Sequence, residues 1–380
     1  MECAMPWKEC SQMSSKLEFA MLAAEPNIDM QALCRSFGVS RKTGYKWRKL
    51  YLEHGKEGLR DRSRIPLSMP RRCSAELEEM VVALHDRYPC WGARKLRALL
   101  PDEIAPHPNT IAAILRRHGR QLVPQTDQTS PSKKRFEHEA PNLLWQMDFK
   151  GHFALTDPRA GRCHPLTVLD DYSRFSIALK ACSGETYEQV QAALTQAFCL
   201  YGLPERITCD NGPPWGTSGH ETLSRLEVWL IRLGVRVSHS RPYHPQTQGK
   251  DERFHRTLKR DLLARFGFNS IEACQLGFDD WREQYNLLRP HEALGQKPPI
   301  TRYRPSARPF PTHLPIVEYD DTDTVRQVRR HGQLAFKGHD YFVGEGLTGE
   351  RVAIRPANDD GLFQVFFCDR EVTQINLRTS

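Results

Sequence analysis

The chain has 380 residues, of which 39% are hydrophobic and 26% are charged. These values are those of an ordinary folded protein, and the length predicts about two to four domains. No apolar run approaches the roughly 18 residues of a membrane-spanning helix, and no charged segment followed by an apolar core marks a secretory signal. The sequence therefore predicts a cytoplasmic protein that has no contact with a membrane.

The 11 cysteines support the same location. Their number is odd, none of them forms a CxxC pair, and most lie among apolar neighbours. This pattern predicts reduced thiols and argues against a disulfide framework or a zinc knuckle.

The net charge of +8 is distributed unevenly along the chain. Residues 1–135 hold 24 lysines and arginines against 15 acids, whereas residues 136–380 hold 30 against 31. The basic excess therefore lies in the first third, which indicates a nucleic-acid-binding region at the N-terminus. On charge alone, a basic domain with no such partner is the alternative.

Residues 1–57 are predicted to form a helix-turn-helix domain. Apolar residues recur at Ile28, Leu33 and Phe37, a glycine turn follows, and Ser40 is a natural N-cap for the second helix. A basic helix of this kind fits the major groove of DNA, and a packed helical hairpin without DNA is the alternative. The expected DNA contacts are Arg41, Lys42, Tyr45, Lys46 and Arg48.

A glycine, Gly44, lies inside that second helix. Glycine costs about 1 kcal/mol relative to alanine in a helix interior. The helix must therefore be stabilised by packing, and we expect Val39, Tyr45 and Trp47 to provide it.

A second helical unit is predicted at residues 74–120, between a basic linker at 58–73 and a linker at 121–141 that is rich in Pro, Gln, Ser and Thr. Ser74 is the expected cap of its first helix and Asn109 that of its last. The unit is similar to a second helix-turn-helix. Arg116 and Arg117 on its last helix are further candidate DNA contacts.

Residues 142–305 mix strands and helices, in the expected order β, β, β, α, β, α, β, α. The second and third strands flank an Asp-Asp-Tyr-Ser turn, which predicts a hairpin with Asp170 and Asp171 as turn residues. Such an order predicts a mixed sheet flanked by helices. Residues 306–380 hold short strand-like runs between glycine and Asn-Asp turns, which predict a small β-barrel.

Three acids lie where this sheet could bring them together. Asp148 is in the middle of the first strand, Asp210 follows the fourth, and Glu252 begins a later helix. Hard carboxylate oxygens suit Mg²⁺ or Mn²⁺, and two such ions can clamp the attacking and leaving oxygens of a phosphoryl transfer. Taken singly, Asp210 before Asn-Gly would be a turn residue, and Glu185 is expected to be a loop acid.

Five motifs in this order resemble the DDE transposases of bacterial insertion sequences, whose catalytic core is similar to retroviral integrase. They are "WQMDFKG" around Asp148, "LDDYSRF" at 169–175, "TCDNGPPWG" around Asp210, "HPQTQGKDERFHRTLK" around Glu252 and "YNLLRPHEALGQKPP" at 285–299. The resemblance is strong over about residues 140–300. It implies that the central sheet has a ribonuclease H-like fold.

The resemblance also implies roles for individual residues. Asp148, Asp210 and Glu252 would be the catalytic acids and would bind two divalent metal ions, Mg²⁺ or its substitute Mn²⁺. Lys259, seven residues after the glutamate, would touch the DNA of the transposon end. In this sequence 41 residues separate Asp210 from Glu252, a longer interval than is common in the family. The extra length is expected in the loop "PPWGTSGHETLS", which can absorb it at little cost.

The helix that begins with Glu252 presents a mixed stripe. At 100° per residue, Glu252, His255 and Lys259 fall together, beside an apolar face of Phe254, Leu258, Leu262 and Phe266. Asp251 projects onto the apolar face, where we expect it only to cap the first turn. His255 could contact DNA or simply pack. Further expected DNA contacts in this region are Arg256 and Asn211.

The function that these motifs imply is that of an active transposase. It would bind the terminal inverted repeats of its element through residues 28–120, cut the 3′ ends with water and join them to target DNA. Holding two ends of double-stranded DNA implies a homodimer or a higher oligomer. The alternatives are a catalytically inert DNA-binding regulator and a ribonuclease H-like nuclease that does not join DNA.

Overall fold

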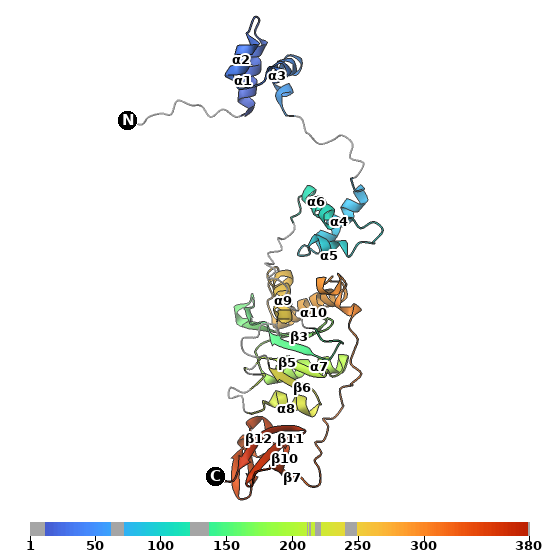
Figure 1. Cartoon of the computed structure of the whole chain (residues 1–380), viewed down its shortest axis with the longest axis vertical. Helices are drawn as coiled ribbons and strands as arrows, with labels where there is room; N and C mark the ends of the chain where they lie inside the picture. The colour runs from blue at the N-terminus through green and yellow to red at the C-terminus, as the bar shows by residue number, and fades with distance from the viewer. Residues whose placement is uncertain are drawn as a thin grey trace, which may run out of the picture. The chain divides into compact units, whose positions relative to one another are not determined.

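The protein was analysed as a computed structural model, drawn in Figure 1. It describes residues 12–61, 72–121, 137–210, 212, 214–216, 222–239 and 249–378. Asn211, and most of the two linkers predicted at 58–73 and 121–141, lie outside the described residues. The chain divides into two compact units, Met1–Cys73 and Ser74–Ser380. Within the described ranges, no helix has both the length and the apolar character needed to cross a membrane.

The first unit contains the predicted helix-turn-helix. Its elements are α1 (Gln12–Ala24), α2 (Met30–Ser36), α3 (Arg41–His54) and a 3₁₀ turn (Gly55–Leu59). Asp29 caps α2, and the Ser40 hydroxyl accepts a hydrogen bond from the Thr43 N–H, as the sequence predicts for α3. Gly38 makes the turn between them with a φ of 65°, a backbone conformation that favours glycine.

Gly44 lies where α3 touches the other two helices. A Cβ atom at this position would lie 2.5 Å from the Cys34 sulfur and 2.9 Å from the Phe19 ring. The expected packing by Val39 and Trp47 is confirmed, because both side chains pack against the core of this unit. The expected packing by Tyr45 is wrong: its side chain is 54% exposed, since it lies on the opposite face of α3.

Replacing Gly44 by alanine is therefore expected to destabilise the first unit by about 1–3 kcal/mol, because overpacking outweighs the better helix propensity of alanine. Thermal unfolding of the full chain would measure it. The exposed Lys49 on the same helix provides the control, and Lys49→Ala should change little. A more stable Gly44→Ala protein would contradict the packing described here.

The second unit begins with a helical module of α4 (Ala75–Arg87), α5 (Ala93–Arg97) and α6 (Pro108–Arg117). Ser74 caps α4 as predicted. The predicted cap of α6, Asn109, is wrong because the helix starts at Pro108. The cap is His107, whose Nδ1 accepts a hydrogen bond from the Asn109 N–H.

The central part of the second unit is a six-stranded mixed sheet. Its strands are β1 (Trp145–Phe149), β2 (Phe153–Ala154), β3 (Arg162–Asp170), β4 (Ser176–Cys182), β5 (Arg206–Cys209) and β6 (Arg236–His239). They lie in the order β2-β3-β1-β5-β6, and β4 also pairs with β3. Strand β3 is antiparallel to β1 and to β4, which confirms the hairpin, whereas β1, β5 and β6 are mutually parallel. Residues 144–155 are expected from the sequence to form a single first strand, and the structure divides them into β1 and the short β2.

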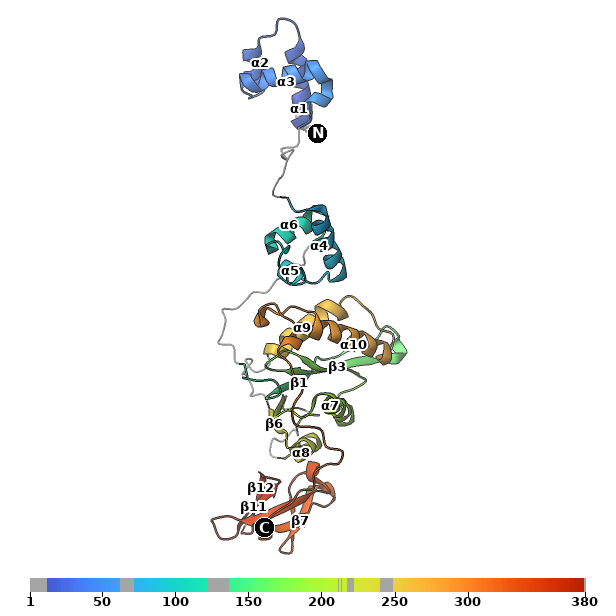
Figure 2. The ribbon, with the colours of Figure 1, turned by 90° about the vertical axis from the view of Figure 1, so that its right-hand side faces the viewer.

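Helices cover both faces of this sheet (Figure 2). They are α7 (Tyr187–Tyr201) and α8 (Arg225–Arg232) on one face, and α9 (Gly249–Leu258) and α10 (Ile271–Leu287) on the other. Because strand side chains alternate, Trp145, Met147 and Phe149 of β1 pack with α7 and α8. The even residues Gln146 and Asp148 therefore face α9.

A π-helical turn, Lys259–Leu263, continues α9. Its Asp261 is buried and accepts hydrogen bonds from Arg289 and, at 2.9 Å, from Arg260. The predicted apolar face is confirmed at Phe254, Leu258 and Leu262, which are buried, but not at Phe266, which is 52% exposed.

The C-terminal residues form an open sheet and a separate hairpin. The sheet has the order β12-β11-β10-β7, and β8 pairs with β9. The strands are β7 (Thr324–Gln327), β8 (Gln333–Phe336), β9 (His339–Phe342), β10 (Arg351–Pro356), β11 (Leu362–Phe367) and β12 (Arg370–Asn376). Among the described strands β12 and β7 do not pair with each other, so the predicted closed barrel is not confirmed.

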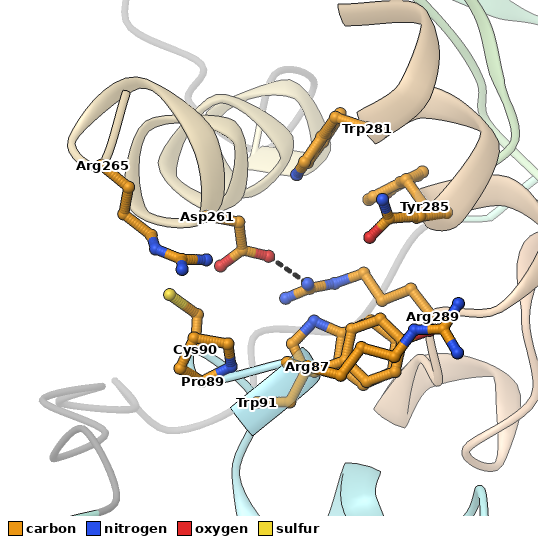
Figure 3. A pocket seen from close by; sticks show the side chains of 11 residues that line it. Arg87, Pro89, Cys90, Trp91, Asp261, Arg265, Trp281, Tyr285 and Arg289 are labelled. Carbon is orange, nitrogen blue, oxygen red and sulfur yellow. Dashed lines mark hydrogen bonds and ion pairs between the residues drawn. The ribbon is translucent and has the colours of Figure 1, made fainter. Parts of the chain in front are cut away.

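The helical module contacts the end of α10 around a small pocket (Figure 3). The Cys90 thiol lies 3.6 Å from the Arg260 carbonyl oxygen, and the Arg289 guanidinium lies 5.6 Å from the centre of the Trp91 ring. Lys95 of α5 is half-buried nearby. Burial, followed by the positive charges of Arg289 and Arg260, lowers the pKa of Lys95 to about 7.

Lys95 is therefore expected to destabilise the fold at low pH. Its pKa in the folded chain lies below the unfolded value of 10.5, so the cost of its buried charge is full below about pH 7 and fades as the pH rises toward 10.5. Lys95→Met should raise the melting temperature at pH 6.5, and this gain should shrink by pH 9.5. Calorimetry would compare it with Lys297→Met, an exposed control. An increase in melting temperature that is the same at both pH values would contradict the lowered pKa of Lys95.

Candidate functional site

Asp148 is held in place from the neighbouring strand. Thr167 lies opposite it in the β1–β3 register, and the Thr167 hydroxyl donates a hydrogen bond of 2.9 Å to the Asp148 carbonyl oxygen. The same hydroxyl lies 2.8 Å from Nε2 of His255 on α9. A hydroxyl has one proton to donate, so His255 must donate from Nε2 and turn an unprotonated Nδ1 toward the Asp148 carboxylate, 3.9 Å away.

His255 is thus part of the support for Asp148. Its side chain is 14% exposed. Burial, followed by the charge of Lys150, lowers the pKa of His255 to about 4, so the ring is neutral at physiological pH. Of the two roles that the sequence leaves open for His255, this placement favours packing over a DNA contact.

The carboxylates of Asp148 and Asp210 face a common region. Burial, and then the negative charge of Asp210, raise the pKa of Asp148 to about 7. The parallel strands β1 and β5 are neighbours, so Asp148 and the residue that follows β5 lie near the same part of the sheet. The repulsion that Asp148 experiences from Asp210 in this half-buried place would be relieved by a cation.

Asp210 is also held through its main chain. His239, the last residue of β6, pairs with Cys209 in the register, and its Nδ1 donates a hydrogen bond of 2.8 Å to the Asp210 carbonyl oxygen. Its Nε2 donates to the Glu227 carboxylate at 3.1 Å. Hydrogen bonds to the Cys209 thiol and to Glu227 raise the pKa of His239 to about 10, so both ring nitrogens carry protons at neutral pH. Sequence reasoning missed this pair, although two parallel strands that end in Cys-Asp and in His could have suggested it.

The two neighbouring acids of α9 lie in opposite environments. Glu252 is exposed, whereas Asp251 is 2% exposed and one of its carboxylate oxygens has no hydrogen-bond partner within the described part of the chain. Burial, followed by the charges of Asp148 and Asp171, raises the pKa of Asp251 well above its usual range. The expected position of Asp251 on the buried face is confirmed, and its side chain is enclosed beside other acids. Its expected capping of the first turn stays a prediction, because the residues just before α9 lie outside the described ones.

The start of α9 is tied to the hairpin turn. The Lys250 ammonium donates hydrogen bonds to the carboxylate and the carbonyl oxygen of Asp171. Asp171 is 1% exposed and also accepts hydrogen bonds from the Gln146 amide at 2.8 Å and from the His138 N–H at 3.0 Å. The expected turn position of Asp171 is therefore right, but the residue also anchors the helix that carries Glu252.

Metal-holding geometry is incomplete in this part of the chain. Among the described residues, no three His, Cys, Asp or Glu side chains lie close enough together to hold a metal ion. The structure brings Asp148 near Asp210 and leaves Glu252 on the exposed side of α9. The donor set, in which the negative charge of Asp210 helps to raise the pKa of Asp148, nevertheless suits a hard divalent cation.

Exposed cations lie beside these acids. Arg256 and Lys259 are on the exposed side of α9 and its π-helical continuation. The nearby charge of Lys259, after burial, lowers the pKa of Lys150, which places the two lysines near each other. Lys150 follows β1 directly and is a further candidate phosphate contact, which the sequence pattern alone did not indicate.

The other candidate DNA contacts differ in how exposed their side chains are. In α3, an exposed stripe contains the residues Arg41, Lys42, Tyr45 and Lys46, while Arg48 is half-buried. In α6, Arg116 is exposed. Arg117 instead forms an ion pair of 2.6 Å with the buried Glu78, so its charge is partly used within the module.

Comparison with known protein families agrees with this architecture. Residues 138–245 and 233–299 each match a family described as an integrase core domain. The chain carries an integrase core domain. Residues 323–380 match the C-terminal domain of the IS481 family of transposases, residues 15–66 a helix-turn-helix domain and residues 43–115 a homeodomain-like domain. The resemblance to insertion-sequence transposases with an integrase-like core is thereby confirmed.

Individual relatives come from insertion elements. A 39.2 kDa protein of insertion element IS476 from Xanthomonas euvesicatoria is 31% identical over 159 residues, 42% of this chain and 43% of that protein. A 31.7 kDa protein of IS407 from Burkholderia multivorans is 28% identical over 160 residues, 42% of this chain and 54% of that protein. The chain thus spans about half the length of these relatives. The HTLV-2 integrase catalytic core in complex with magnesium shows a slight likeness, with 17% identity, a TM-score of 0.34 and coverage of 44% of this chain and 100% of that chain.

The buried carboxylate of Asp251 leads to a stability prediction. Asp251→Asn should stabilise the metal-free protein by about 1–3 kcal/mol, because it removes an acid whose ionised form is disfavoured by burial and by its neighbours. Thermal unfolding in the presence of a chelator would measure the change. The control is the adjacent exposed acid, since Glu252→Gln should leave the melting temperature unaltered. A destabilised Asp251→Asn protein would show that the carboxylate has a stabilising partner.

Proposed function

We propose that this protein is an active transposase that binds the terminal inverted repeats of its own insertion sequence. It cuts the 3′ ends of the element with water and joins the freed hydroxyl groups to target DNA, without a covalent protein–DNA intermediate. The observation that carries the proposal is the pair Asp148 and Asp210, which an integrase-type sheet places so near each other that one charge raises the pKa of the other.

We propose that Asp148, Asp210 and Glu252 are the residues that hold two divalent cations, Mg²⁺ or its substitute Mn²⁺. The fit rests on the donor set: a half-buried carboxylate with a raised pKa beside a second acid is a place where positive charge is favourable. Such ions, when bound, polarise a phosphodiester and lower the pKa of an attacking hydroxyl. The chain itself contributes the position of the acids, through Thr167 for Asp148 and through His239 for Asp210.

The DNA would lie along the exposed side of α9. Lys259, Arg256 and Lys150 supply positive charge beside the acids, which positions phosphates without reading sequence. Sequence recognition belongs to the exposed stripe of α3, where Arg41, Lys42, Tyr45 and Lys46 can reach base edges and phosphates. Arg116 adds a contact from the second module.

Two ends must be held at once, so we propose that the protein acts as a homodimer or a higher oligomer on DNA in the bacterial cytoplasm. Each helix-turn-helix then holds one terminal repeat. The integrase core of either copy is brought to the cleavage point by the DNA rather than by its own sequence recognition.

The acids are the direct test. Asp148→Asn, Asp210→Asn and Glu252→Gln should each lower 3′-end cleavage and strand transfer by about 100-fold or more, because each removes a charge that binds the cations. Binding to terminal-repeat DNA should remain. Oligonucleotide cleavage and joining assays with Mg²⁺ and Mn²⁺, beside a gel-shift assay, would measure both.

A reciprocal control separates recognition from chemistry. Replacing Arg41 and Lys46 together by alanine should remove binding to the terminal repeat while the three acids stay intact. Near-normal transfer by any single acid variant would exclude that acid as a cation ligand. Cleavage by the wild-type protein without joined products would instead indicate a nuclease, and no cleavage at all would indicate an inert regulator.

A further inference from the structure

The C-terminal domain rests on the segment that begins α8. Gly346 lies in a 3₁₀ turn, Glu345–Leu347, and a Cβ atom at Gly346 would lie 2.2 Å from the Leu223 carbonyl oxygen and 3.0 Å from the Arg225 nitrogen. The two main chains are therefore in direct contact, with no room for a side chain between them. Val228 and Leu223 also belong to the hydrophobic core of the C-terminal domain, together with Leu347.

The same segment holds Glu227 in a fixed orientation. Ser224 caps α8 by accepting a hydrogen bond from the Glu227 N–H at 3.2 Å, and one Glu227 carboxylate oxygen accepts a hydrogen bond of 2.8 Å from the Ser224 N–H. The Ser224 hydroxyl donates to the Trp215 carbonyl oxygen at 2.8 Å. This reciprocal capping leaves the second carboxylate oxygen of Glu227 for His239.

His239 completes a path from the C-terminal domain to the catalytic region. It donates to Glu227 from one nitrogen and to the Asp210 carbonyl oxygen from the other. The imidazole is planar and rigid, and both of its ends are bonded, so a shift of Glu227 must be passed to Asp210 or must break a hydrogen bond.

We propose that the C-terminal domain acts as a brace for Asp210, through Gly346, the capped start of α8, Glu227 and His239. In this arrangement His239 is a positioning residue. The inference rests on the proposed function in one respect, the assignment of Asp210 as a cation ligand. It adds a role for the C-terminal domain that requires no DNA contact: displacing this domain weakens the cation site from a distance.

A second contact between α8 and the C-terminal domain makes the proposal specific. Arg232, at the other end of α8, forms an ion pair of 3.1 Å with Glu350 of the C-terminal domain. Among the described residues, the Arg232 side chain bonds to Glu350 and to the Pro315 carbonyl oxygen, and neither the Arg232 nor the Glu350 side chain bonds to Ser224, Glu227 or His239. If the domain only stabilised the fold, loss of this pair and loss of the Gly346 contact would act alike. The proposed brace requires that loss of the Gly346 contact weaken the cation site and that loss of the Arg232–Glu350 pair leave it unchanged.

The test uses the full chain and Mn²⁺ as the probe, with affinity measured by calorimetry. Gly346→Ala and His239→Gln should each weaken Mn²⁺ binding on the order of 10-fold, the usual cost of losing a partner that orients a ligand. The double variant should bind Mn²⁺ no more weakly than whichever single variant has the lower affinity, because both substitutions interrupt the same path. The controls are Glu350→Gln and His118→Gln, which breaks another His–Glu pair, with Glu78. Both should leave the affinity unchanged.

Hydrogen exchange of the metal-free chain provides an independent readout. Both variants should speed exchange in peptides that cover residues 206–210 and leave residues 145–149 unchanged. The faster exchange at residues 206–210 should appear even if Gly346→Ala loosens the whole C-terminal domain, because the test removes the contact between this domain and the start of α8. Additive losses in the double variant, or unchanged exchange at 206–210 in Gly346→Ala, would overturn the brace. Altered exchange in a chain that binds no Mn²⁺ would uphold the brace and remove the proposed cation site.

Discussion

The constraint on which this core depends is the repulsion between carboxylates that are shielded from water. The negative charge of Asp210 raises the energy of the charged form of Asp148, and the charges of both raise that of Asp251, which has one oxygen without a hydrogen-bond partner among the described residues. Such a group of acids is unfavourable unless something holds it. The surrounding structure supplies hydrogen bonds to the carbonyl oxygens of Asp148 and Asp210.

Two different elements hold the two aspartates. Asp148 is fixed through Thr167 on the antiparallel neighbour β3, and Asp210 through His239 on the parallel neighbour β6. In both cases the bonded atom of the aspartate is its carbonyl oxygen. The supports therefore fix where each residue lies without using the charge that a cation needs, which is how an arrangement of repelling acids persists inside a fold.

Much of the fold and of the candidate site could be predicted from local sequence patterns. The remaining features depend on contacts between residues that are distant in the sequence. The Ser40 cap, the β3–β4 hairpin and the placement of the acids at strand positions follow from short-range rules. Helix phase also placed Asp251 on the buried face, but it could not show that other acids lie opposite. The exposure of Tyr45, the His239–Glu227 bond and the open edges of the C-terminal sheet depend on which elements meet, and periodicity carries no information about that.

The end of the π-helical turn shows how a local feature alters such a prediction. A continuing helix would place Phe266 near Leu262 on the apolar face, yet Phe266 is half-exposed because the helix ends at Leu263 and residues 264 and 265 form a turn. Glu252 in α9 and Lys259 at the start of the π-helical turn are both exposed. Beyond them, the buried pair of Asp261 with Arg289 ties the turn to the end of α10. One continuous helical segment thus exposes Lys259 to solvent and buries its next acid, Asp261.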